Sequence, residues 1–394
     1  MKITKKCPIC EKKNSVLFLK KKKQPTKIYP VPNLTTFKIK DLSLYICYSC
    51  RHVFQHPIPT NKEIDSFYKD EQNHYTSLIK NPELGESYEK EKIDYIKKVI
   101  LRFKHKPSLV EIGGFDGYLI YKLKNLLAKS LLIEPNKEGT IIAKKHKIKS
   151  VNKYLNLKLA KTLQNKFDIV VSRHVIEHVA DLKDFVKCLS LLVKPNGIII
   201  IETPNMDTIL KDITTRAFIH QHIHYFSTFS LNEIFNKLQL FKKKVLIGNS
   251  IIVCFKNYSE QNNKNNIEKI KFENISYYKK LVKNYNIKLK KKIEKLYQII
   301  KKQPKSFYWI YGASSVVNDL FSVYNLRKDL VKGIIDLDKK KINYRLPVCK
   351  NIPIFSIDNL KKVKKDLIII ATNNKNDAIK ILDKYKHEGK RLFL

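Results

Sequence analysis

The sequence predicts an α/β protein with a small N-terminal metal-binding block, a central block around a mostly parallel sheet, and a second Rossmann-like α/β block. Short apolar runs alternate with helical patterns from about residue 85 to 256, and again from 306, as is typical of parallel sheets whose strands helices connect. Two CxxC pairs precede both runs. We expect four segments, at residues 1–70, 71–256, 257–305 (a linker and a long helix) and 306–394.

The length and the composition of the chain restrict the class of protein. A chain of 394 residues with 43% hydrophobic residues is long enough for several domains and too apolar for wholesale disorder. No apolar run is long enough to cross a bilayer, and the start MKITKKCPIC lacks the apolar segment of a secretory signal. We therefore expect a cytoplasmic monomer or dimer without a transmembrane segment.

The formal charge of +42 comes mainly from lysines that are spread along the chain. Proteins that bind nucleic acid tend to cluster their lysines with arginines on one face. We therefore expect no nucleic-acid partner, and a basic surface that attracts an acidic substrate such as a nucleotide diphosphate.

Four cysteines near the N-terminus predict a metal site. Cys7 and Cys10 form one CxxC pair, and Cys47 and Cys50 form the other. Each pair places two thiolates on one side of a tight turn, and two pairs give the tetrahedral S₄ set that Zn²⁺ prefers. Because all four positions are cysteines, no ligand position is left for water, so we expect a structural zinc ion. The alternative is four free thiols.

A glycine turn and an acidic residue follow the first two strands of the central block. VEIGGFDG holds Glu111, Gly113 and Gly117 between an apolar run and a helical pattern, where small residues let backbone approach a ligand. Glu134 ends the next strand, LLIEP, and its carboxylate can accept hydrogen bonds from both hydroxyls of a ribose. Taken alone, the glycine sequence fits a purely structural βα turn as well as it fits a ligand-binding turn. The turn becomes a strong signal of a ligand-binding site when it is taken together with Glu134 and with the runs FDIVVSRHVIEHV and LVKPNGIIIIETPN.

This order of motifs resembles the class I S-adenosylmethionine-dependent methyltransferases. The resemblance implies S-adenosylmethionine as the cofactor, with the methionine part on the glycine loop and the ribose on the acidic residue. The cofactor-binding residues that we expect are Glu111, Gly113, Asp116, Gly117, Glu134 and His174. Phe115 stands where that family has a small or polar residue.

The CxxC module, this fold and a third block opening with YGA together resemble the nucleotide-sugar C-methyltransferases, over nearly the whole chain. Those enzymes act on deoxysugars with a 4-keto group and carry Tyr-His-Glu-His followed by Tyr-Phe-Ser. Here residues 219–222 read IHQH and 225–227 read YFS. The resemblance implies a nucleotide-linked sugar substrate, a role in surface-polysaccharide or glycan precursor synthesis, and His222 as general base. The expected catalytic residues are His222, His178, Gln221 and Tyr75.

Two positions depart from that pattern, Ile219 at the tyrosine and Gln221 at the carboxylate. Glutamine cannot raise the basicity of a neighbouring histidine, and isoleucine cannot donate to an oxyanion. The methyl acceptor, carbon or oxygen, therefore stays open. An RNA or protein methyltransferase and a catalytically lapsed cofactor-binding scaffold are further alternatives.

His220 and His224 flank His222 at two-residue spacing, so in an extended segment all three side chains would share a face. Such spacing is compatible with a metal site. However, the local sequence offers no carboxylate ligand, and the four cysteines already form the zinc site that we expect. We expect His220, His224 and Tyr225 to make structural or substrate hydrogen bonds.

The C-terminal block contains a half-formed nucleotide-binding turn. Tyr311-Gly312-Ala313 ends one apolar run, and Asp336 ends the next, where its carboxylate could hold a ribose. We expect Tyr311, Gly312 and Asp336 to take part in substrate binding. The alternative is a vestigial fold that only packs against its neighbour.

Overall fold

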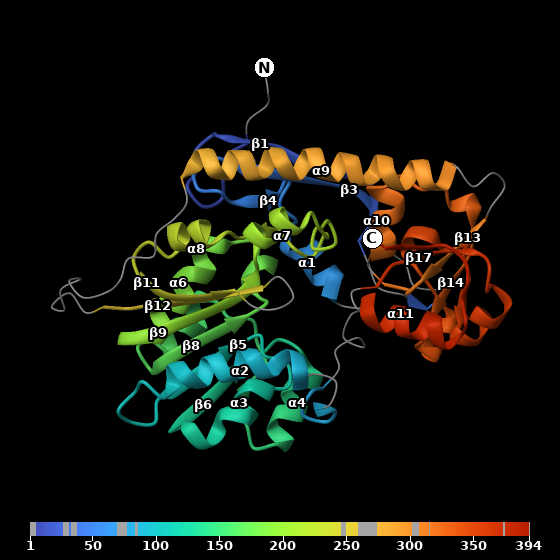
Figure 1. Cartoon of the computed structure of the whole chain (residues 1–394). Coiled ribbons are helices and arrows are strands. Elements are labelled where there is room, and N and C mark those ends of the chain that lie inside the picture. Colours follow the sequence, from blue (N-terminus) through green and yellow to red (C-terminus); the bar gives the residue numbers. More distant parts are fainter. Residues whose placement is uncertain are drawn as a thin grey trace. The chain divides into compact units, whose positions relative to one another are not determined.

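The computed structural model of the chain describes residues 5–26, 31–32, 38–68, 77–82, 86–245, 250–258, 274–301, 307–314, 316–372 and 375–393 (Figure 1). The chain folds into two compact units. The first comprises residues 1–18, 44–211 and 222–280, and the second comprises residues 19–43, 212–221 and 281–394. Because each unit combines segments that are distant in the sequence, the four consecutive segments expected from the motif order remain a prediction.

The first unit is built around a seven-stranded sheet. Its strands are, in sheet order, β11 (Gln239–Val245), β12 (Ser250–Lys256), β9 (Val193–Pro204), β8 (Phe167–Arg173), β5 (Ser108–Ile112), β6 (Lys129–Ile133) and β7 (Ser150–Val151). From β9 to β7 all neighbours pair in parallel, whereas β12 runs antiparallel to both β9 and β11. The predicted mostly parallel central sheet is confirmed.

Helices cover both faces of this sheet (Figure 1). The helices of this unit are α1 (Asn61–Tyr68), α2 (Glu86–Ile100), α3 (Tyr118–Leu123), α4 (Lys137–Lys145), α5 (Leu157–Thr162), α6 (Leu182–Leu192), α7 (Met206–Asp212), which ends at the unit boundary, and α8 (Thr228–Ile234). Successive strand residues point to opposite faces, so Leu109 packs in the core with α2 and α3, and Val110 in the core with α6 and α8. Burial on both faces explains why these strands are continuous apolar runs.

A four-stranded sheet has the order β1-β3-β4-β10. Its strands are β1 (Ser15–Pro25), β3 (Ile39–Cys47), β4 (Val53–Gln55) and β10 (His224–Tyr225). β10 pairs antiparallel with β4, so that His224 lies opposite Phe54 and Tyr225 opposite Val53. Three of these strands, β1, β3 and β4, come from the N-terminal block. Within the first unit, the histidine-rich segment thus adds a strand to the N-terminal block.

The second unit contains a five-stranded sheet in which all neighbours pair in parallel. Its strands are, in sheet order, β16 (Ile354–Ser356), β14 (Val331–Asp336), β13 (Tyr308–Tyr311), β17 (Leu367–Ile370) and β18 (Arg391–Phe393). Its helices are α9 (Ile275–Lys301, which begins in the first unit), α10 (Val316–Ser322) and α11 (Lys375–Lys384), and β2 (Val31–Pro32) pairs with β15 (Tyr344–Arg345). The Rossmann-like α/β block predicted at the C-terminus is confirmed.

The long helix that we predicted within residues 257–305 is observed as α9, although residues 259–273 lie outside the described residues. Ile293, Leu296 and Ile300 of this helix pack on the core of the second unit. No described helix is long and apolar enough to span a membrane.

A buried ion pair joins β1 to α10 inside the second unit. Lys21 and Asp319 are 1% and 3% exposed, and their charged groups are in direct contact. Lys21 Nζ also donates to the carbonyl oxygens of Thr215, at 2.9 Å, and Phe218, at 2.8 Å, while the Thr215 hydroxyl donates to Asp319. Because each buried charge has several hydrogen-bond partners, the desolvation cost of both is offset. The network fixes the early part of the chain within the second unit.

Candidate functional site

The glycine turn after β5 needs glycines at several positions. Gly113 and Gly117 both have φ of 73°, in the left-handed region that favours glycine. A Cβ on Gly113 would lie 2.4 Å from Cγ2 of Val175, and one on Gly114 would lie 2.4 Å from the carboxyl carbon of Glu111. The turn therefore requires glycine at these positions, because a side chain would clash with Val175 or with Glu111.

Glu134, which follows β6, brackets this turn. Its Oε2 accepts the backbone N–H of Phe115 at 2.9 Å, and its Oε1 accepts the N–H of Asn136 at 2.7 Å. Burial raises the pKa of the carboxyl group, and the two backbone donors oppose that rise. Each carboxylate oxygen has a second lone pair, so Glu134 can still accept hydrogen bonds from a ligand.

The other two acidic residues at this turn have contrasting surroundings. Asp116 accepts the Ser77 hydroxyl at 2.8 Å and the N–H groups of Ile79 at 3.0 Å and Tyr118 at 3.1 Å, so it joins the start of α3 to residues 77–79. Glu111 is 2% exposed, and its Oε2 has no hydrogen-bond partner among the described residues. Burial raises the pKa of Glu111 to about 8.

These residues fit S-adenosylmethionine. A buried carboxyl oxygen without a partner suits a cationic group of a ligand, because an ion pair would compensate its burial. Glu134 retains acceptor capacity for the hydroxyl groups of a ligand.

A charged cluster lies at the carboxyl ends of β8 and β9. Arg173 Nε donates to Glu202 at 2.7 Å, and its Nη2 donates to Glu89 at 2.5 Å. Lys92 Nζ lies 2.8 Å from Glu202 and 3.1 Å from Glu89. His174 Nε2 lies 3.0 Å from Glu202. We did not predict a role for Glu202 from the sequence. The cluster fixes the ends of the two strands next to the glycine turn.

His174, predicted to bind the cofactor, also lies with its Nδ1 3.2 Å from Glu177 Oε1. Burial opposes a charge on this ring, but the carboxylates of Glu202 and Glu177 outweigh it and raise the pKa of His174 to about 10. His174 is therefore an imidazolium at neutral pH and a partner of two carboxylates.

The structure brings His178 and His222 together. Their rings meet edge to face, with centroids 4.8 Å apart. Glu177, in the short helical turn Ile176–His178, is fully buried beside them, and one ligand atom of each of the three residues lies within 4.8 Å of the others. We did not predict a role for Glu177, although its position directly before His178 was a readable signal.

The flanking residues of the histidine segment have other partners. His224 is buried, with Nδ1 3.0 Å from His52 Nε2 and Nε2 3.1 Å from the carbonyl oxygen of Val179. Burial lowers the pKa of His224 to about 4. His220 Nε2 lies 3.4 Å from the carbonyl oxygen of Lys40.

Gln221 donates from Nε2 to the carbonyl oxygen of Thr26 at 3.0 Å. The ring of Tyr225 lies 6.0 Å from that of His222. Within this segment only His224–Tyr225 forms a strand, and His222 and His224 contact different histidines, His178 and His52. Tyr75, the remaining predicted catalytic residue, lies outside the described residues.

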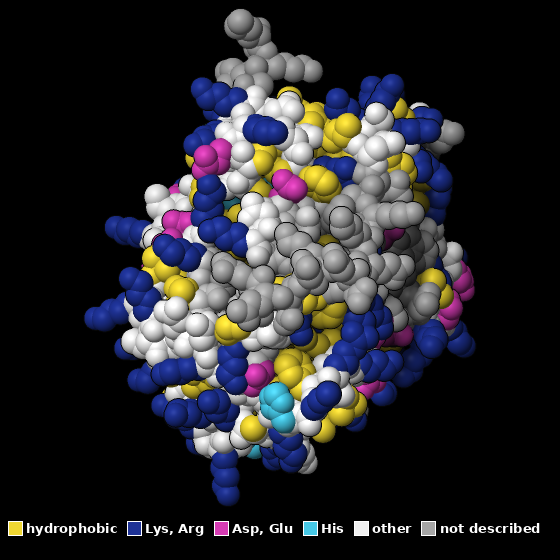
Figure 2. All heavy atoms as spheres, turned by 90° about the vertical axis from the view of Figure 1, so that its left-hand side faces the viewer, with side chains coloured by type: hydrophobic (Ala, Val, Ile, Leu, Met, Phe, Trp, Pro, Cys, Tyr) yellow, Lys and Arg dark blue, Asp and Glu magenta, His cyan; other side chains and the backbone are white. Residues whose placement is uncertain are grey.

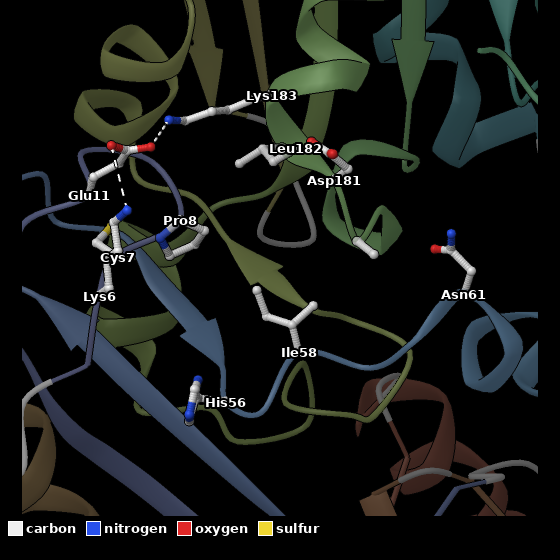
Figure 3. Close-up of a pocket in the computed structure, with 11 residues that line it drawn as sticks. Lys6, Cys7, Pro8, Glu11, His56, Ile58, Asn61, Asp181, Leu182 and Lys183 are labelled. Atoms are coloured by element: carbon white, nitrogen blue, oxygen red, sulfur yellow. Dashed lines mark hydrogen bonds and ion pairs between the residues drawn. The ribbon is translucent and has the colours of Figure 1, made fainter. Parts of the chain in front are cut away.

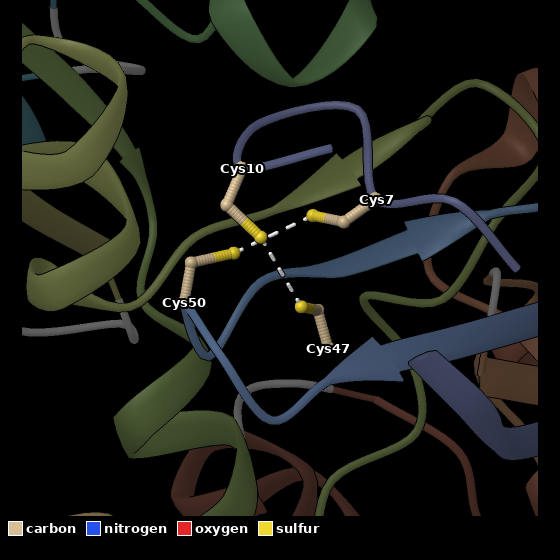
Figure 4. Close-up of side chains that lie close together, drawn as sticks. All are labelled: Cys7, Cys10, Cys47 and Cys50. Carbon is tan, nitrogen blue, oxygen red and sulfur yellow. Dashed lines mark hydrogen bonds between the residues drawn. The ribbon is translucent and has the colours of Figure 1, made fainter. Parts of the chain in front are cut away.

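The four cysteines converge from two turns of the same design (Figure 4). Cys7 Sγ lies 3.4 Å from Cys50 Sγ, and Cys10 Sγ lies 3.6 Å from Cys47 Sγ. In each turn the residue after the second cysteine has φ of 60° and donates its N–H to the carbonyl oxygen of the first cysteine; these residues are Glu11 and Arg51. A tetrahedron with Zn–S bonds of about 2.3 Å has sulfur atoms about 3.8 Å apart. The cluster is thus suited to a zinc ion.

A surface pocket of about 570 Å³ lies beside this cluster in the first unit (Figure 3). Its wall includes Cys7, His56 and the start of α6, and Glu11 forms ion pairs there with Lys183 and with Lys6, the latter at 3.7 Å. Cys7 is the only predicted site residue in its wall. The pocket is therefore separate from the predicted chemistry.

The C-terminal turn repeats part of the first one. Gly312 has φ of 99°, and its N–H donates to the carbonyl oxygen of Ile335 at 2.8 Å. Asp336 accepts the N–H of Ala313 at 2.7 Å and that of Asp338 at 2.9 Å. Tyr311 is 3% exposed. The three predicted substrate residues Tyr311, Gly312 and Asp336 therefore meet at one turn.

The basic side chains are dispersed on the face that Figure 2 shows. Lysines and arginines alternate there with uncharged and hydrophobic side chains, and the few acidic groups lie among them. On this face the described basic side chains form no single concentrated patch.

Two family matches cover adjacent parts of the chain. Residues 84–241 match the family described as "Methyltransferase domain", and residues 256–394 match the one described as "C-methyltransferase C-terminal domain".

Two curated relatives are both named ubiquinone biosynthesis O-methyltransferase. The one from Pelagibacter ubique is 33% identical over 127 residues, which are 29% of this chain and 52% of that protein. The one from Bradyrhizobium diazoefficiens is 31% identical over 103 residues, which are 25% of this chain and 40% of that protein. The chain thus spans about half, or less, of the length of these relatives.

Among solved structures, the N-methyltransferase NodS from Bradyrhizobium japonicum WM9 has 15% identity and a TM-score of 0.37, covering 44% of this chain and 98% of NodS. The same enzyme in complex with S-adenosyl-L-homocysteine has 13% identity and a TM-score of 0.35, covering 43% and 87%.

The family matches and the fold agree. The first match covers the strands of the seven-stranded sheet from β5 to β9, together with the glycine turn, Glu134 and the His178–His222 pair. The second covers α9 and the five-stranded parallel sheet. The chain therefore carries a methyltransferase domain of the class I, S-adenosylmethionine-dependent kind, followed by a C-methyltransferase C-terminal domain.

Proposed function

We propose that the chain transfers a methyl group from S-adenosylmethionine to a carbon next to the keto group of a nucleotide-linked sugar. The match of residues 256–394 to a C-methyltransferase C-terminal domain carries this proposal, because it associates carbon methylation with this methyltransferase domain. The motif order that resembles the nucleotide-sugar C-methyltransferases supports the sugar substrate. The product would serve surface-polysaccharide or glycan precursor synthesis in the cytoplasm.

The cofactor, when bound, supplies a methyl group on a positively charged sulfur. Glu111 and the turn at Gly113 would hold its methionine part, since they offer a buried carboxyl oxygen and a left-handed glycine turn at the end of a strand. Glu134 would hold the ribose hydroxyls with the lone pairs that Phe115 and Asn136 leave available. Asp116 and Gly117 keep the turn in shape, and His174 supports the adjacent strand ends.

Carbon methylation next to a ketone requires removal of the α-proton and stabilisation of the resulting enolate oxygen. We assign the first task to His222, because an imidazole ordinarily titrates near neutral pH. His178 faces it at 4.8 Å between ring centroids and has an N–H that can serve the enolate oxygen. Tyr75 keeps its predicted catalytic role, and His220, His224 and Tyr225 keep their predicted structural or substrate hydrogen bonds.

We assign a nucleotide-binding role to Tyr311, Gly312 and Asp336 in the second unit, and a structural zinc ion to the four cysteines. The left-handed turn at Gly312 and the carboxylate of Asp336 support the first assignment. Sulfur separations of 3.4 and 3.6 Å support the second.

The test is methylation of a panel of nucleotide-linked 4-ketodeoxysugars that carry deuterium at the α-carbon, followed by mass spectrometry of the product. We expect a methylated product without the deuterium, because the base removes it before the carbon is methylated. In the same assay His222→Asn should bind the cofactor and lose turnover by about 100-fold or more. Near-wild-type turnover in this variant would refute the assignment of the base.

A second candidate is sugar O-methylation on the same scaffold. Two observations favour it: the curated relatives are named O-methyltransferases, and Ile219 and Gln221 replace the family's tyrosine and carboxylate. Deprotonating a hydroxyl also needs a base but develops no enolate. A methylated product that retains the α-deuterium would select this candidate.

A further inference from the structure

A fully buried carboxylate lies against the two histidines of the proposed base. Glu177 precedes His178 in the chain, and its Oε1 lies 4.0 Å from His178 Nε2. A ligand atom of His222 is within 4.8 Å of both. Glu177 is 0% exposed, whereas the two histidines are partly exposed, so the carboxylate lies deeper than the two rings, which remain accessible to a ligand.

Surrounding residues hold this carboxylate in one position. The Thr203 hydroxyl donates to Glu177 Oε2 at 3.1 Å, and His174 Nδ1 lies 3.2 Å from Oε1. The backbone N–H of Ile223 donates to the carbonyl oxygen of Glu177 at 2.7 Å. That bond joins the residue after His222 to the residue before His178, so it fixes the two histidine segments to each other. Such rigid support is what an acid–base pair needs.

The position where related sugar enzymes carry a carboxylate cannot supply one here. Gln221 is an amide, and its Nε2 donates to the carbonyl oxygen of Thr26. A carboxylate next to a histidine stabilises the imidazolium that forms when the base takes up a proton. Among the described residues, Glu177 offers that carboxylate.

We propose that Glu177 is the positioning residue of the acid–base pair and takes over the task of the missing carboxylate at position 221. This inference rests on the proposed function. His222 takes the α-proton, the carbon–hydrogen electron pair becomes the enolate, and Glu177 balances the positive charge that the proton brings to the pair. The second imidazole, His178, then donates its N–H to the enolate oxygen, the task that a tyrosine at position 219 would otherwise perform.

The same three side chains have the composition of a divalent-cation site. However, Oε1 of Glu177 already lies within hydrogen-bond distance of His174, which is cationic beside two carboxylates. A divalent metal ion there would face that positive charge with two positive charges of its own, whereas a protonated imidazole carries only one. The acid–base assignment is therefore favoured, and a metal ion becomes one outcome of the test.

The experiment measures exchange of the α-hydrogen of a 4-ketodeoxysugar nucleotide in D₂O by proton NMR. Full-length enzyme is used with S-adenosylhomocysteine, which has no methyl group to transfer. We expect wild-type exchange, and a loss of about 100-fold or more in Glu177→Gln with the dissociation constant of the sugar nucleotide changed less than about threefold. Glu177→Ala should lose exchange similarly and regain part of it with added formate, because a small carboxylate can enter the vacated space.

Glu294→Gln is the matched control, since this glutamate lies on the exposed side of α9 and should leave exchange unchanged. Exchange at the wild-type rate in Glu177→Gln would overturn this inference and leave the proposed function standing. A loss of exchange in Glu177→Ala that formate does not restore would do the same. No exchange in the wild type would remove the proposed carbon chemistry and the inference with it. Exchange that is lost on treatment with a chelator and restored by Mn²⁺ would replace the inference with a cation site, because thiolate clusters disfavour that ion.

Discussion

The two glycine turns of the molecule share one hydrogen-bond scheme. In the first unit, Gly113 donates to the carbonyl oxygen of Ile133, and the next residue after that isoleucine, Glu134, accepts a backbone N–H from the turn. In the second unit, Gly312 donates to Ile335, and the following Asp336 accepts an N–H from its turn. In both, the other carboxylate oxygen accepts the N–H two residues further on.

The differences lie in the charges around the two turns. Lys341 Nζ lies 3.2 Å from both oxygens of Asp336, whereas the carboxylate of Glu134 accepts only backbone N–H groups from the described residues. Two residues before the first glycine stands the buried Glu111, and at the matching place before Gly312 stands the buried Ile310. Among the described residues, the same hydrogen-bond scheme is thus surrounded by two carboxyl groups without a basic partner of this kind in the first unit. In the second unit it is surrounded by an apolar residue and a lysine–aspartate pair. The hydrogen-bond scheme alone therefore identifies a fold, and the surrounding charges indicate the ligand.

The largest expected effect concerns the buried carboxyl that only the first turn has. Burial raises the pKa of Glu111 to about 8, so the folded chain keeps this proton at a pH where the unfolded chain has lost it. The free energy of unfolding of the first unit should therefore fall by about 1.4 kcal/mol per pH unit, about 4 kcal/mol in all, between about pH 5 and pH 8. Glu111→Gln should lose this slope.

Amide hydrogen exchange of peptides that contain β5, corrected for the intrinsic pH dependence of exchange, would measure this slope. Trp309, the single tryptophan, lies in the second unit, so its fluorescence is an internal control that should not respond to the substitution. Equal slopes in the wild type and Glu111→Gln would mean that the carboxyl is compensated, and the contrast with Ile310 would lose its meaning.

The next effect separates the two acidic residues by their ligands. Glu134→Gln should weaken binding of S-adenosylhomocysteine by about 10- to 100-fold, because an amide has one accepting oxygen and its NH₂ group opposes a backbone N–H. Asp336→Asn should leave this affinity unchanged. Isothermal titration calorimetry measures both, and similar losses in the two variants would contradict the assignment of the cofactor to the first turn.

The sequence predicted the features that depend on local spacing. The two cysteine turns, the glycine turn with Glu134, and the turn with Asp336 all lie where the motifs placed them, because each is made by residues a few positions apart or at the ends of adjacent strands. The strands of both sheets were recognisable as buried apolar runs. By contrast, β16 and β18 have three residues each, too few to form a pattern.

Features that depend on distant segments meeting were not predictable. His224 finds His52, and Gln221 finds Thr26, only because the chain folds back on its N-terminal part within each unit. The same applies to Glu177, whose carboxylate acquires its place from Thr203 and from the backbone of Ile223. Spacing along the chain carries no information on such pairings. The residue type alone, an acid directly before a candidate catalytic histidine, was the available clue.

The smallest expected effect tests the lysine that distinguishes the second turn. Lys341 and Asp336 are partly exposed, at 29% and 10% of their side chains, and such pairs contribute about 1 kcal/mol or less. Lys341→Met should therefore change the free energy of unfolding of the second unit by no more than that, as followed by Trp309 fluorescence in urea.

If Asp336 binds a ribose, removing its lysine should tighten binding of uridine diphosphate by about threefold. The carboxylate would then no longer have to give up its contact with the lysine in order to accept the ribose hydroxyls. The exposed neighbour Lys340, changed to Met, is the control for lost surface charge. Weaker binding in Lys341→Met than in Lys340→Met would instead assign the lysine to the phosphates, and the second turn would then recognise its ligand through a cation where the first uses carboxylates.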